Sequence, residues 1–271
     1  MKKANVPTYE LFAIKYASNP RRTAHESFLS THDVHDGPLP LDFSIWAAHS
    51  EGRVILIDSG ADEYVCTRRG HDFLRCPTEG LKLLGFDASQ VTDIIVTHMH
   101  WDHMGNFDKF PNANFHVHPA EMNHATGPCM CHPLLRRPYD ADQVCSMIQA
   151  LYRGRVFFNQ DGEEIAPGIT AHHMGGHTPG LQVVRVPTAR GPVVVASDAM
   201  HYYANASRRN PFPVLVNVHD YLKASQAIYR LAPSPEHVVA GHDPLVFQIY
   251  AAPSPQLEGI AVRLDAAPAA N

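Results

Sequence analysis

Four side chains that can bind a metal ion lie within six consecutive positions. Residues 98–103 read His-Met-His-Trp-Asp-His, which is the pattern His-x-His-x-Asp-His. Imidazole nitrogens suit zinc and other transition ions, while a carboxylate adds negative charge and tolerates harder ions. Because residues two apart in an extended loop point the same way, His98 and His100 can hold one ion. Asp102 and His103 can then turn toward another, so the spacing favours two neighbouring ions over a single one.

The motif follows an apolar, β-branched run at residues 94–96, which is typical of a buried strand. Its polar residues would therefore lie on the loop at the C-terminal end of that strand, where sites in sheet-based folds gather. A surface loop that is merely rich in histidine is the alternative, because the chain contains 19 His. We favour the metal site, because a strand-terminal His-x-His-x-Asp-His pattern rarely arises by chance.

Three later residues occupy positions of the same kind. His177 lies in a Gly-Gly-His-Thr-Pro-Gly turn, and Asp198 and His242 each follow an apolar run that ends in a turn. Each residue alone would be interpreted as a cap or a turn former. Together with the motif they complete a set of seven potential ligands. We expect one ion to be held by His98, His100 and His177, the other by Asp102, His103 and His242, and Asp198 to bridge them.

The elements that must position these side chains are strands, with helices between them. Residues 42–48 and 53–58 predict the two strands of a hairpin, and Asp58 ends the second strand at a turn. We expect Asp58 to orient a metal-binding histidine or the turn, rather than to bind an ion. Further strands are predicted at 114–118, 156–158, 169–172, 181–186, 193–196 and 237–240, and helices at 78–86, 119–125, 140–151 and 221–231. The pattern has no linker and no strict βαβ order. It indicates one α/β domain over residues 1–271, with two mixed sheets packed face to face and helices outside.

The composition disfavours several other classes of protein. The 271 residues carry a formal net charge of −5, which argues against nucleic acid or an anionic membrane as a partner. No apolar run near the N-terminus is long enough for an export signal or a membrane span, so we expect a cytoplasmic protein. The five cysteines include a Cys-Met-Cys-His cluster at residues 129–132, which lacks the spacing of a zinc ribbon or finger. We interpret the cysteines as buried or half-buried thiols in a reducing cytoplasm.

The order of these motifs resembles the metallo-β-lactamase fold superfamily. Within it, the chain is similar to the N-acyl homoserine lactonases and to related lactone hydrolases such as pyridoxolactonase. The resemblance rests on His-x-His-x-Asp-His, Gly-His-Thr-Pro-Gly, Ser-Asp and Gly-His-Asp in this order, on Ile-Asp-Ser-Gly at 57–60 and on the stretch at 40–46. It covers residues 10–250. It implies a four-layer αβ/βα sandwich with a dinuclear metal site at its rim, a small-molecule substrate and, from the family's frequent dimers, a homodimer.

One position departs from the lactonase pattern. Homoserine lactonases usually carry a Tyr three positions after the bridging Asp, in contact with the substrate carbonyl, whereas this chain has His201, followed by Tyr202 and Tyr203. Either His201 takes over as hydrogen-bond donor, or Tyr202 shifts in, or the substrate differs. We therefore predict Asp102, His201 and Tyr202 as catalytic side chains, with Asp102 accepting or relaying a proton. Candidate pocket walls are Trp46, Trp101, Tyr202, Tyr203 and Phe212, and the loop at 31–40 is a candidate flap.

The resemblance and the ligand set predict an enzyme that opens a lactone by attack of a hydroxide bridging two divalent ions. Zinc is the expected metal, with iron, cobalt or manganese as alternatives. An N-acyl homoserine lactone is a candidate substrate, which would make the role quorum quenching.

The main alternative is a hydrolase of another ester or of a thioester, similar to an arylesterase or to glyoxalase II. Residues 243–271 are too few for the helical C-terminal domain of glyoxalase II. A β-lactamase would need an export signal, and a nuclease would need a basic surface. A non-catalytic metal-binding protein fits poorly, because all seven ligands are present.

Overall fold

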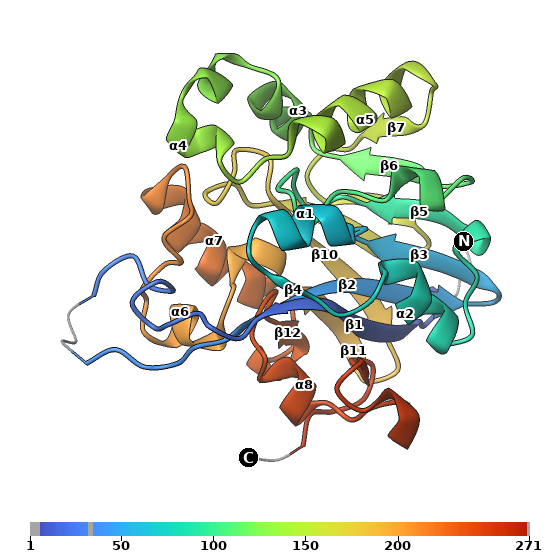
Figure 1. Ribbon diagram of the computed structural model, residues 1–271. Coiled ribbons are helices and arrows are strands. Elements are labelled where there is room, and N and C mark those ends of the chain that lie inside the picture. The colour runs from blue at the N-terminus through green and yellow to red at the C-terminus, as the bar shows by residue number, and fades with distance from the viewer. Residues whose placement is uncertain (1–5, 32–34, 270–271) are drawn as a thin grey trace.

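Two β-sheets packed face to face form the centre of the protein, in a computed structural model that describes residues 6–31 and 35–269 (Figure 1). The first sheet has the order β13, β1, β2, β3, β5, β6 and β7, and β4 pairs with β1. Its strands are β1 (Glu10–Asn19), β2 (Leu41–Ser50), β3 (Arg53–Ile57), β4 (Asp72–Phe73), β5 (Val91–Ile95), β6 (Asn114–Val117), β7 (Val156–Phe158) and β13 (Ala261–Arg263). The second sheet has the order β12, β11, β10, β9 and β8. Its strands are β8 (Glu163–Ala166), β9 (Ile169–His173), β10 (Gln182–Thr188), β11 (Gly191–Val195) and β12 (Val238–Val239).

Strand β3 shows how one sheet contributes to two hydrophobic cores. Val54 and Leu56 belong to the core between the first sheet and its helices. Ile55 and Ile57 belong to the core that the first sheet shares with the second. Successive side chains of a strand point to opposite faces, so an uninterrupted apolar run indicates a strand that is covered on both sides.

Helices cover the outer faces of both sheets (Figure 1). The first sheet is covered by α1 (Glu63–Arg68), α2 (Pro77–Leu83), α3 (Pro119–Ala125) and α5 (Ala141–Tyr152). On the other side, α7 (Val218–Arg230) packs Ala224 and Ile228 into the core of the second sheet. The shorter helices are α4 (Pro133–Arg136), α6 (Tyr203–Ser207) and α8 (Val246–Ile249). The predicted α/β fold, a four-layer αβ/βα sandwich, is therefore confirmed.

The predicted hairpin is formed by β2 and β3. Its two-residue turn consists of Glu51 and Gly52, with φ of 50° and 76°. Positive φ at both turn residues matches the right-handed twist of the flanking strands, and glycine adopts such a conformation without steric cost. Helix α3 has the predicted bounds of 119–125, and α5 begins after Asp140, whose side chain accepts hydrogen bonds from the first turn.

Two pairs of parallel strands bring distant segments to one site. Strand β3 pairs in parallel with β5, and β11 pairs in parallel with β12. The ends of parallel strands meet at the same edge of a sheet, so Asp58 after β3 lies beside the loop at residues 97–105 after β5. For the same reason Asp198 after β11 lies beside His242 after β12.

The sequence pattern does not predict the strands β1 and β13, which pair with each other. Most of β1 is buried on both faces, so its side chains lack the alternation of apolar and polar residues that marks a half-buried strand. Strand β13 has only three residues, and its pairing with β1 depends on contacts between the two ends of the chain.

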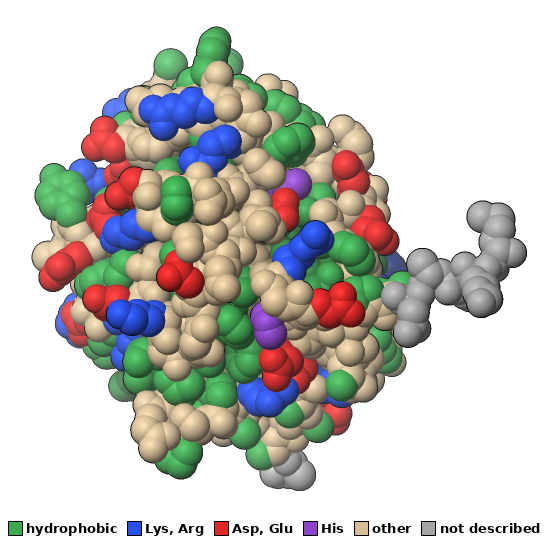
Figure 2. All heavy atoms as spheres, turned by 90° about the vertical axis from the view of Figure 1, so that its right-hand side faces the viewer, with side chains coloured by type: hydrophobic (Ala, Val, Ile, Leu, Met, Phe, Trp, Pro, Cys, Tyr) green, Lys and Arg blue, Asp and Glu red, His purple; other side chains and the backbone are tan. Residues whose placement is uncertain are grey.

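Acidic and basic side chains are interspersed among apolar ones on the face of the molecule shown in Figure 2. Within residues 6–31 and 35–269, no helix has the length and apolar character that a membrane span requires.

Candidate metal centre

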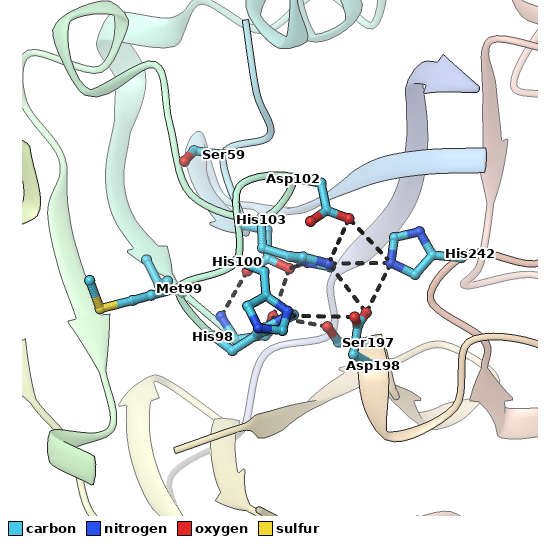
Figure 3. A network of polar contacts seen from close by, with 12 residues as sticks. Ser59, His98, Met99, His100, Asp102, His103, Ser197, Asp198 and His242 are labelled. Atoms are coloured by element: carbon cyan, nitrogen blue, oxygen red, sulfur yellow. Dashed lines mark hydrogen bonds and ion pairs between the residues drawn. The ribbon is translucent and has the colours of Figure 1, made fainter. Parts of the chain in front are cut away.

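The predicted metal ligands converge at the C-terminal ends of β5, β11 and β12 and at the turn between β9 and β10. Figure 3 shows six of them close together: His98, His100, Asp102, His103, Asp198 and His242. The buried candidate ligands form three overlapping groups: His98, His100, His177 and Asp198; Asp102, His103 and His242; and Asp198, His201 and His242. Within each group the ligand atoms lie within 4.8 Å of one another, and all the side chains are buried. The first two groups contain the seven residues that the sequence predicts as ligands of two ions, whereas the third adds His201, which the sequence does not predict as a ligand.

The carboxylate of Asp198 connects the first two groups through its two oxygens. Oδ1 lies 2.9 Å from Nε2 of His242 and 3.2 Å from Nε2 of His103. Oδ2 lies 2.9 Å from Nε2 of His177 and 3.5 Å from Nε2 of His98. One oxygen therefore faces each group of histidines, which is the arrangement that a bridging carboxylate requires.

Hydrogen bonds orient two of the histidines. Each bond is made at the ring nitrogen that faces away from the cluster. Nδ1 of His103 lies 2.7 Å from Oδ2 of Asp58, and Nδ1 of His242 lies 2.8 Å from the carbonyl oxygen of Asp42. Because a carbonyl oxygen only accepts, Nδ1 of His242 carries the proton, and the lone pair of Nε2 is directed at the cluster. Asp58 orients a histidine, as the sequence predicts.

The chemistry of this donor set fits bound cations. Nε2 of His98 is buried and has no hydrogen-bond partner among the described residues. Nδ1 of His100 lies 2.9 Å from Nε2 of His177, and Nε2 of His103 lies 3.2 Å from Nε2 of His242. Two imidazole lone pairs at such distances repel each other unless a proton or a cation lies between them. Imidazole nitrogens together with carboxylates are the ligands that divalent transition ions prefer.

Burial and neighbouring charges set the charge state of these side chains. Burial lowers the pKa of His98 and His100 well below the ordinary histidine value, so both rings are neutral, which is the form that binds metal. Burial alone would raise the pKa of Asp198, but the surrounding histidines, His201 and His103 above all, hold it well below its usual value. The cluster therefore presents an ionised carboxylate together with the neutral rings of His98 and His100. Burial alone would lower the pKa of His103 and of His242, but the carboxylates of Asp198 and Asp102 raise it above the ordinary histidine value.

Two unusual backbone conformations bring the ligands close together. Ser197, directly before the central carboxylate, has a φ of 44°, which non-glycine residues rarely adopt, and its Oγ lies 2.9 Å from Oγ1 of Thr97. Gly176, directly before the histidine of the β9–β10 turn, has a φ of 87°. A Cβ atom at Gly176 would lie 2.3 Å from the backbone nitrogen of Tyr221, so only glycine fits this position.

Glu121 is a buried carboxylate near the site, and the sequence does not predict its role. Its Oε1 accepts hydrogen bonds from the backbone N–H of Met99 at 2.9 Å and from the hydroxyl of Tyr139 at 3.1 Å. Its Oε2 accepts from the backbone N–H of Gly180 at 3.0 Å. Glu121 therefore ties the loop after β5 to the turn that carries His177. A glutamate in the first turn of a helix is typical of an exposed residue, so no sequence signal marks this role.

A cavity of about 320 Å³ opens onto the cluster. Trp101 and Phe212 line it, as predicted, and Phe43 also contributes to its wall. The prediction of Trp46 and Tyr203 as pocket walls is wrong, because both pack in the core that contains the second sheet. Strand β2 is buried on both faces, and its alternation directs Trp46 between the sheets rather than to the cavity.

His201 and Tyr202 lie differently with respect to this cavity. His201 lines it, stacks on Phe212 with ring centroids 3.7 Å apart, and places Nε2 3.0 Å from Oδ2 of Asp198. Tyr202 is buried in the core under the first sheet, and its hydroxyl donates to the carbonyl oxygen of Leu39 at 3.4 Å. Of the two predicted catalytic alternatives, the structure therefore brings His201 to the cluster and leaves Tyr202 outside the cavity wall.

Two further predictions concern segments outside the cluster. All five cysteines are free: Cys66 is buried, Cys76 and Cys129 are half-buried, and Cys131 and Cys145 are exposed, so the prediction of buried or half-buried thiols is wrong for the last two. The candidate flap at 31–40 cannot be traced as a whole, because residues 32–34 lie outside the described residues.

The chain is similar to known proteins of one family. The family model described as the metallo-beta-lactamase superfamily matches residues 43–242, a range that contains all seven predicted ligands. A protein named N-acyl homoserine lactonase from Bacillus sp is 27% identical over 224 residues, which is 76% of this chain and 81% of the relative. The N-acyl homoserine lactonase AttM of Azorhizobium caulinodans is 26% identical over 231 residues, which is 77% of this chain and 84% of the relative.

Other similar proteins carry broader names. A protein of Mycobacterium tuberculosis named as a probable metallo-hydrolase is 25% identical over 232 residues, covering 72% of this chain and 73% of the relative. Among solved structures, a quorum-quenching N-acyl homoserine lactone lactonase superposes with a TM-score of 0.70 at 21% identity, covering 88% of this chain and 94% of the other. A protein from Staphylococcus aureus described as a probable metal-dependent hydrolase superposes with a TM-score of 0.72 at 14% identity, covering 98% of this chain and 97% of the other. At these identities, the structural likeness establishes the fold.

Proposed function

Because the chain belongs to the metallo-beta-lactamase superfamily, we propose that it is a metal-dependent hydrolase that opens lactones with the help of two divalent ions. The predicted family is confirmed by the match over residues 43–242. The names of the relatives, N-acyl homoserine lactonase and metallo-hydrolase, support metal-dependent hydrolysis and favour a lactone as the substrate class.

The observation that carries the proposal is the position of Asp198 between two groups of buried histidines. A single ion would need only one of these groups, whereas each carboxylate oxygen of Asp198 has its own histidines within 3.5 Å. The proposed ligands are His98, His100 and His177 on one side, Asp102, His103 and His242 on the other, and Asp198 between them. Ions held there would polarise a substrate carbonyl and lower the pKa of the attacking water. Zinc is the first metal to test, since the donor set is mainly imidazole.

Asp102 is positioned to interact with the water that attacks the substrate. Its carboxylate lines the cavity, and its Oδ2 lies 3.4 Å from Nε2 of His103 and 3.7 Å from Nε2 of His242. Burial alone would raise the pKa of Asp102, but His103 and His242 lower it well below its usual value. Asp102 therefore stays ionised, and we assign to it the acceptance of a hydrogen bond from the attacking water.

His201 is the proposed polar contact for the substrate carbonyl. Burial lowers the pKa of His201 to about 3, so the ring is neutral and carries a single N–H. In the structure Nε2 lies 3.0 Å from Oδ2 of Asp198, and stacking on Phe212 fixes the ring at the cavity wall. A substrate oxygen that reaches this wall would compete with Asp198 for the N–H of His201 and would be stabilised as negative charge develops on it.

Hydrolysis of another ester or of a thioester is the second candidate function. The observation that favours it is His201 itself, which stands where the lactonase pattern has tyrosine. A change of this contact is compatible with a different acyl substrate on the same scaffold.

The test is hydrolysis of a panel by the zinc-loaded protein. The panel contains acyl homoserine lactones, an aromatic lactone, an aryl ester, a glutathione thioester and a β-lactam. We expect the highest kcat/KM for a lactone, by about tenfold or more over the ester and the thioester. A preference of similar size for the ester or the thioester would replace the lactonase proposal with the alternative. As a control, protein with an alanine at His98 should lose metal and activity together.

A further inference from the structure

Three arginines that have no ion-pair partner among residues 6–31 and 35–269 surround the cavity above the candidate metal centre. The sequence contains four Arg-Arg pairs, at 21–22, 68–69, 136–137 and 208–209, and in the first three of them the second residue lines the cavity. These cavity-lining residues are Arg22, Arg69 and Arg137. They come from the loop between β1 and β2, from the end of α1 and from the end of α4, so the fold gathers them from three separate segments.

The first members of two of these pairs show what an arginine on this surface usually does. Arg21 binds Asp72 at 2.8 Å, and Arg68 binds Asp140. In the described part of the chain, no Asp or Glu carboxylate lies within ion-pair distance of the three cavity arginines. The carboxylates of Asp102 and Asp198 line the same cavity, but both belong to the candidate ligand set. With these carboxylates committed to ions, the three positive charges repel one another, and an anion placed among them would relieve this repulsion.

Two of the three guanidinium groups are fixed in place and still have N–H groups available for a ligand. Arg22 lies over the ring of Phe212, with 4.6 Å from its Cζ atom to the ring centroid, and Arg69 lies over Trp101 at 5.1 Å. Arg69 donates to the carbonyl oxygens of Arg137 and Tyr139, while its Nε is buried and has no hydrogen-bond partner among the described residues. A buried N–H without an acceptor costs free energy that a ligand oxygen can recover.

Arg137 differs from the other two because its side chain makes no hydrogen bond in the described structure and is exposed. Its charge nevertheless affects the pKa of neighbouring arginines. Burial lowers the pKa of Arg22 and of Arg69. The carboxylate of Glu26 opposes this effect at Arg22 and that of Asp102 opposes it at Arg69, while the nearby charge of Arg137 adds to it at both. Both guanidiniums remain charged at neutral pH, since arginine does not deprotonate in proteins.

We infer that Arg22, Arg69 and Arg137 bind a carboxylate that the substrate carries in addition to its scissile ring. The inference rests on the proposed lactonase function and names its substrate class as lactones with an anionic substituent, in place of uncharged acyl homoserine lactones. Guanidinium groups suit this ligand, because their planar fork of N–H donors matches the two oxygens of a carboxylate. The carboxylates of Asp102 and Asp198 would be committed to the ions, so they would not compete for the arginines.

The test compares matched lactones that differ only in charge. One pair is γ-butyrolactone with a carboxylate on the ring and the same lactone with a carboxamide. The other pair is homoserine lactone with an N-succinyl group and its terminal amide. For the zinc-loaded protein we expect kcat/KM to be about tenfold higher for the anion in at least one pair, as charge-assisted hydrogen bonds would provide. We also expect 0.5 M NaCl, roughly a threefold shorter screening length than 0.05 M, to reduce this preference.

The decisive variants are Arg137→Gln and Arg136→Gln. Arg136 is adjacent in sequence and exposed but does not line the cavity, so it is the matched control for a lost surface charge. Arg137→Gln should lower kcat/KM for the preferred anion by about tenfold and for its amide by less than about twofold, and Arg137→Lys should recover part of the loss. Arg136→Gln should leave kcat/KM unchanged for both substrates. Because Arg137 makes no side-chain hydrogen bond, the variant should fold with an unchanged melting temperature.

Three outcomes would overturn the inference. Equal hydrolysis of anion and amide in both pairs would reject it and leave the lactonase proposal standing. An anion preference that survives Arg137→Gln, Arg69→Gln and Arg22→Gln in folded proteins would assign the preference to the metal centre instead. If the zinc-loaded protein opens none of the lactones, the proposed function fails, and the substrate class inferred from it fails with it.

Discussion

Nδ1 of His103 lies 2.7 Å from Oδ2 of Asp58, and both side chains are buried behind the metal centre. Asp58 also accepts hydrogen bonds from the backbone N–H of Thr97 at 2.7 Å and from its hydroxyl at 2.9 Å. One carboxylate thus fixes a histidine ring and the start of the loop that carries the motif. Its own backbone has a φ of 61°, so the turn after β3 is shaped to place it there.

Replacing Asp58 with Asn should weaken metal binding without removing a ligand. An amide can donate to Nδ1 of His103 and so favour the tautomer whose Nε2 carries a proton, which cannot bind an ion. Loss of such an orienting partner typically lowers metal affinity or activity by about 10–100-fold. The measurement is metal affinity by competition with a chelating dye. Asp93→Asn is the matched control, since Asp93 pairs with His116 at 2.8 Å in the same sheet away from the centre.

Substituting Asp198 with Asn should uncouple the two halves of the centre. The substitution removes a negative charge that faces histidines on both sides, so we expect lower metal content and a decrease in kcat of about 10²-fold or more. Metal content by elemental analysis and kcat on the preferred lactone are measured on the same preparation. Unchanged turnover at full metal content would reject the bridging role.

His201 and Tyr202 can be separated by one variant of each. Removing a hydrogen-bond donor to a developing oxyanion costs about 10²–10³ in kcat, so His201→Ala should approach this range. Tyr202→Phe removes only a hydroxyl that donates to Leu39 outside the cavity, and kcat should change by less than about twofold. Normal kinetics for the His201 variant together with a large loss for the Tyr202 variant would reverse the assignment.

Glu121 should contribute to stability through the hydrogen bonds that join two loops of the site. Glu121→Ala leaves the backbone N–H groups of Met99 and Gly180 without an acceptor in a buried position, which should cost about 2–4 kcal/mol. Urea unfolding measures the loss. Tyr139→Phe removes only the third hydrogen bond and should cost about 1 kcal/mol. Equal and small effects of both variants would show that Glu121 does not hold the loops together.

The sequence predicts the candidate ligands because each lies at the end of an apolar run. Strands end at sheet edges, and the end of a strand can be predicted from a single sequence by the change to glycine and polar residues. The hairpin at Glu51 and Gly52 can be predicted for the same local reason. What brings His103 within 3.2 Å of Asp198 is the packing of the first sheet against the second, which joins segments far apart in the chain.

Other features could not be predicted because they depend on which neighbour covers a residue. Glu121 looks like an exposed helix residue until the loops at Met99 and Gly180 are placed over it. Trp46 looks like a pocket aromatic, but the strand that carries it is covered on both faces. The Arg-Arg pairs give no sign of which guanidinium turns toward the cavity, since that direction is set by the ends of α1 and α4 relative to the metal centre.

Lactone opening is proposed to depend on two ions held by these side chains. The most direct test is a titration of metal-free protein with Zn²⁺, with the rate of lactone opening followed at each addition. We predict no activity in the metal-free protein and a rise that reaches its plateau at about two equivalents of zinc per chain. Full activity without metal, or a plateau at one equivalent, would contradict the account.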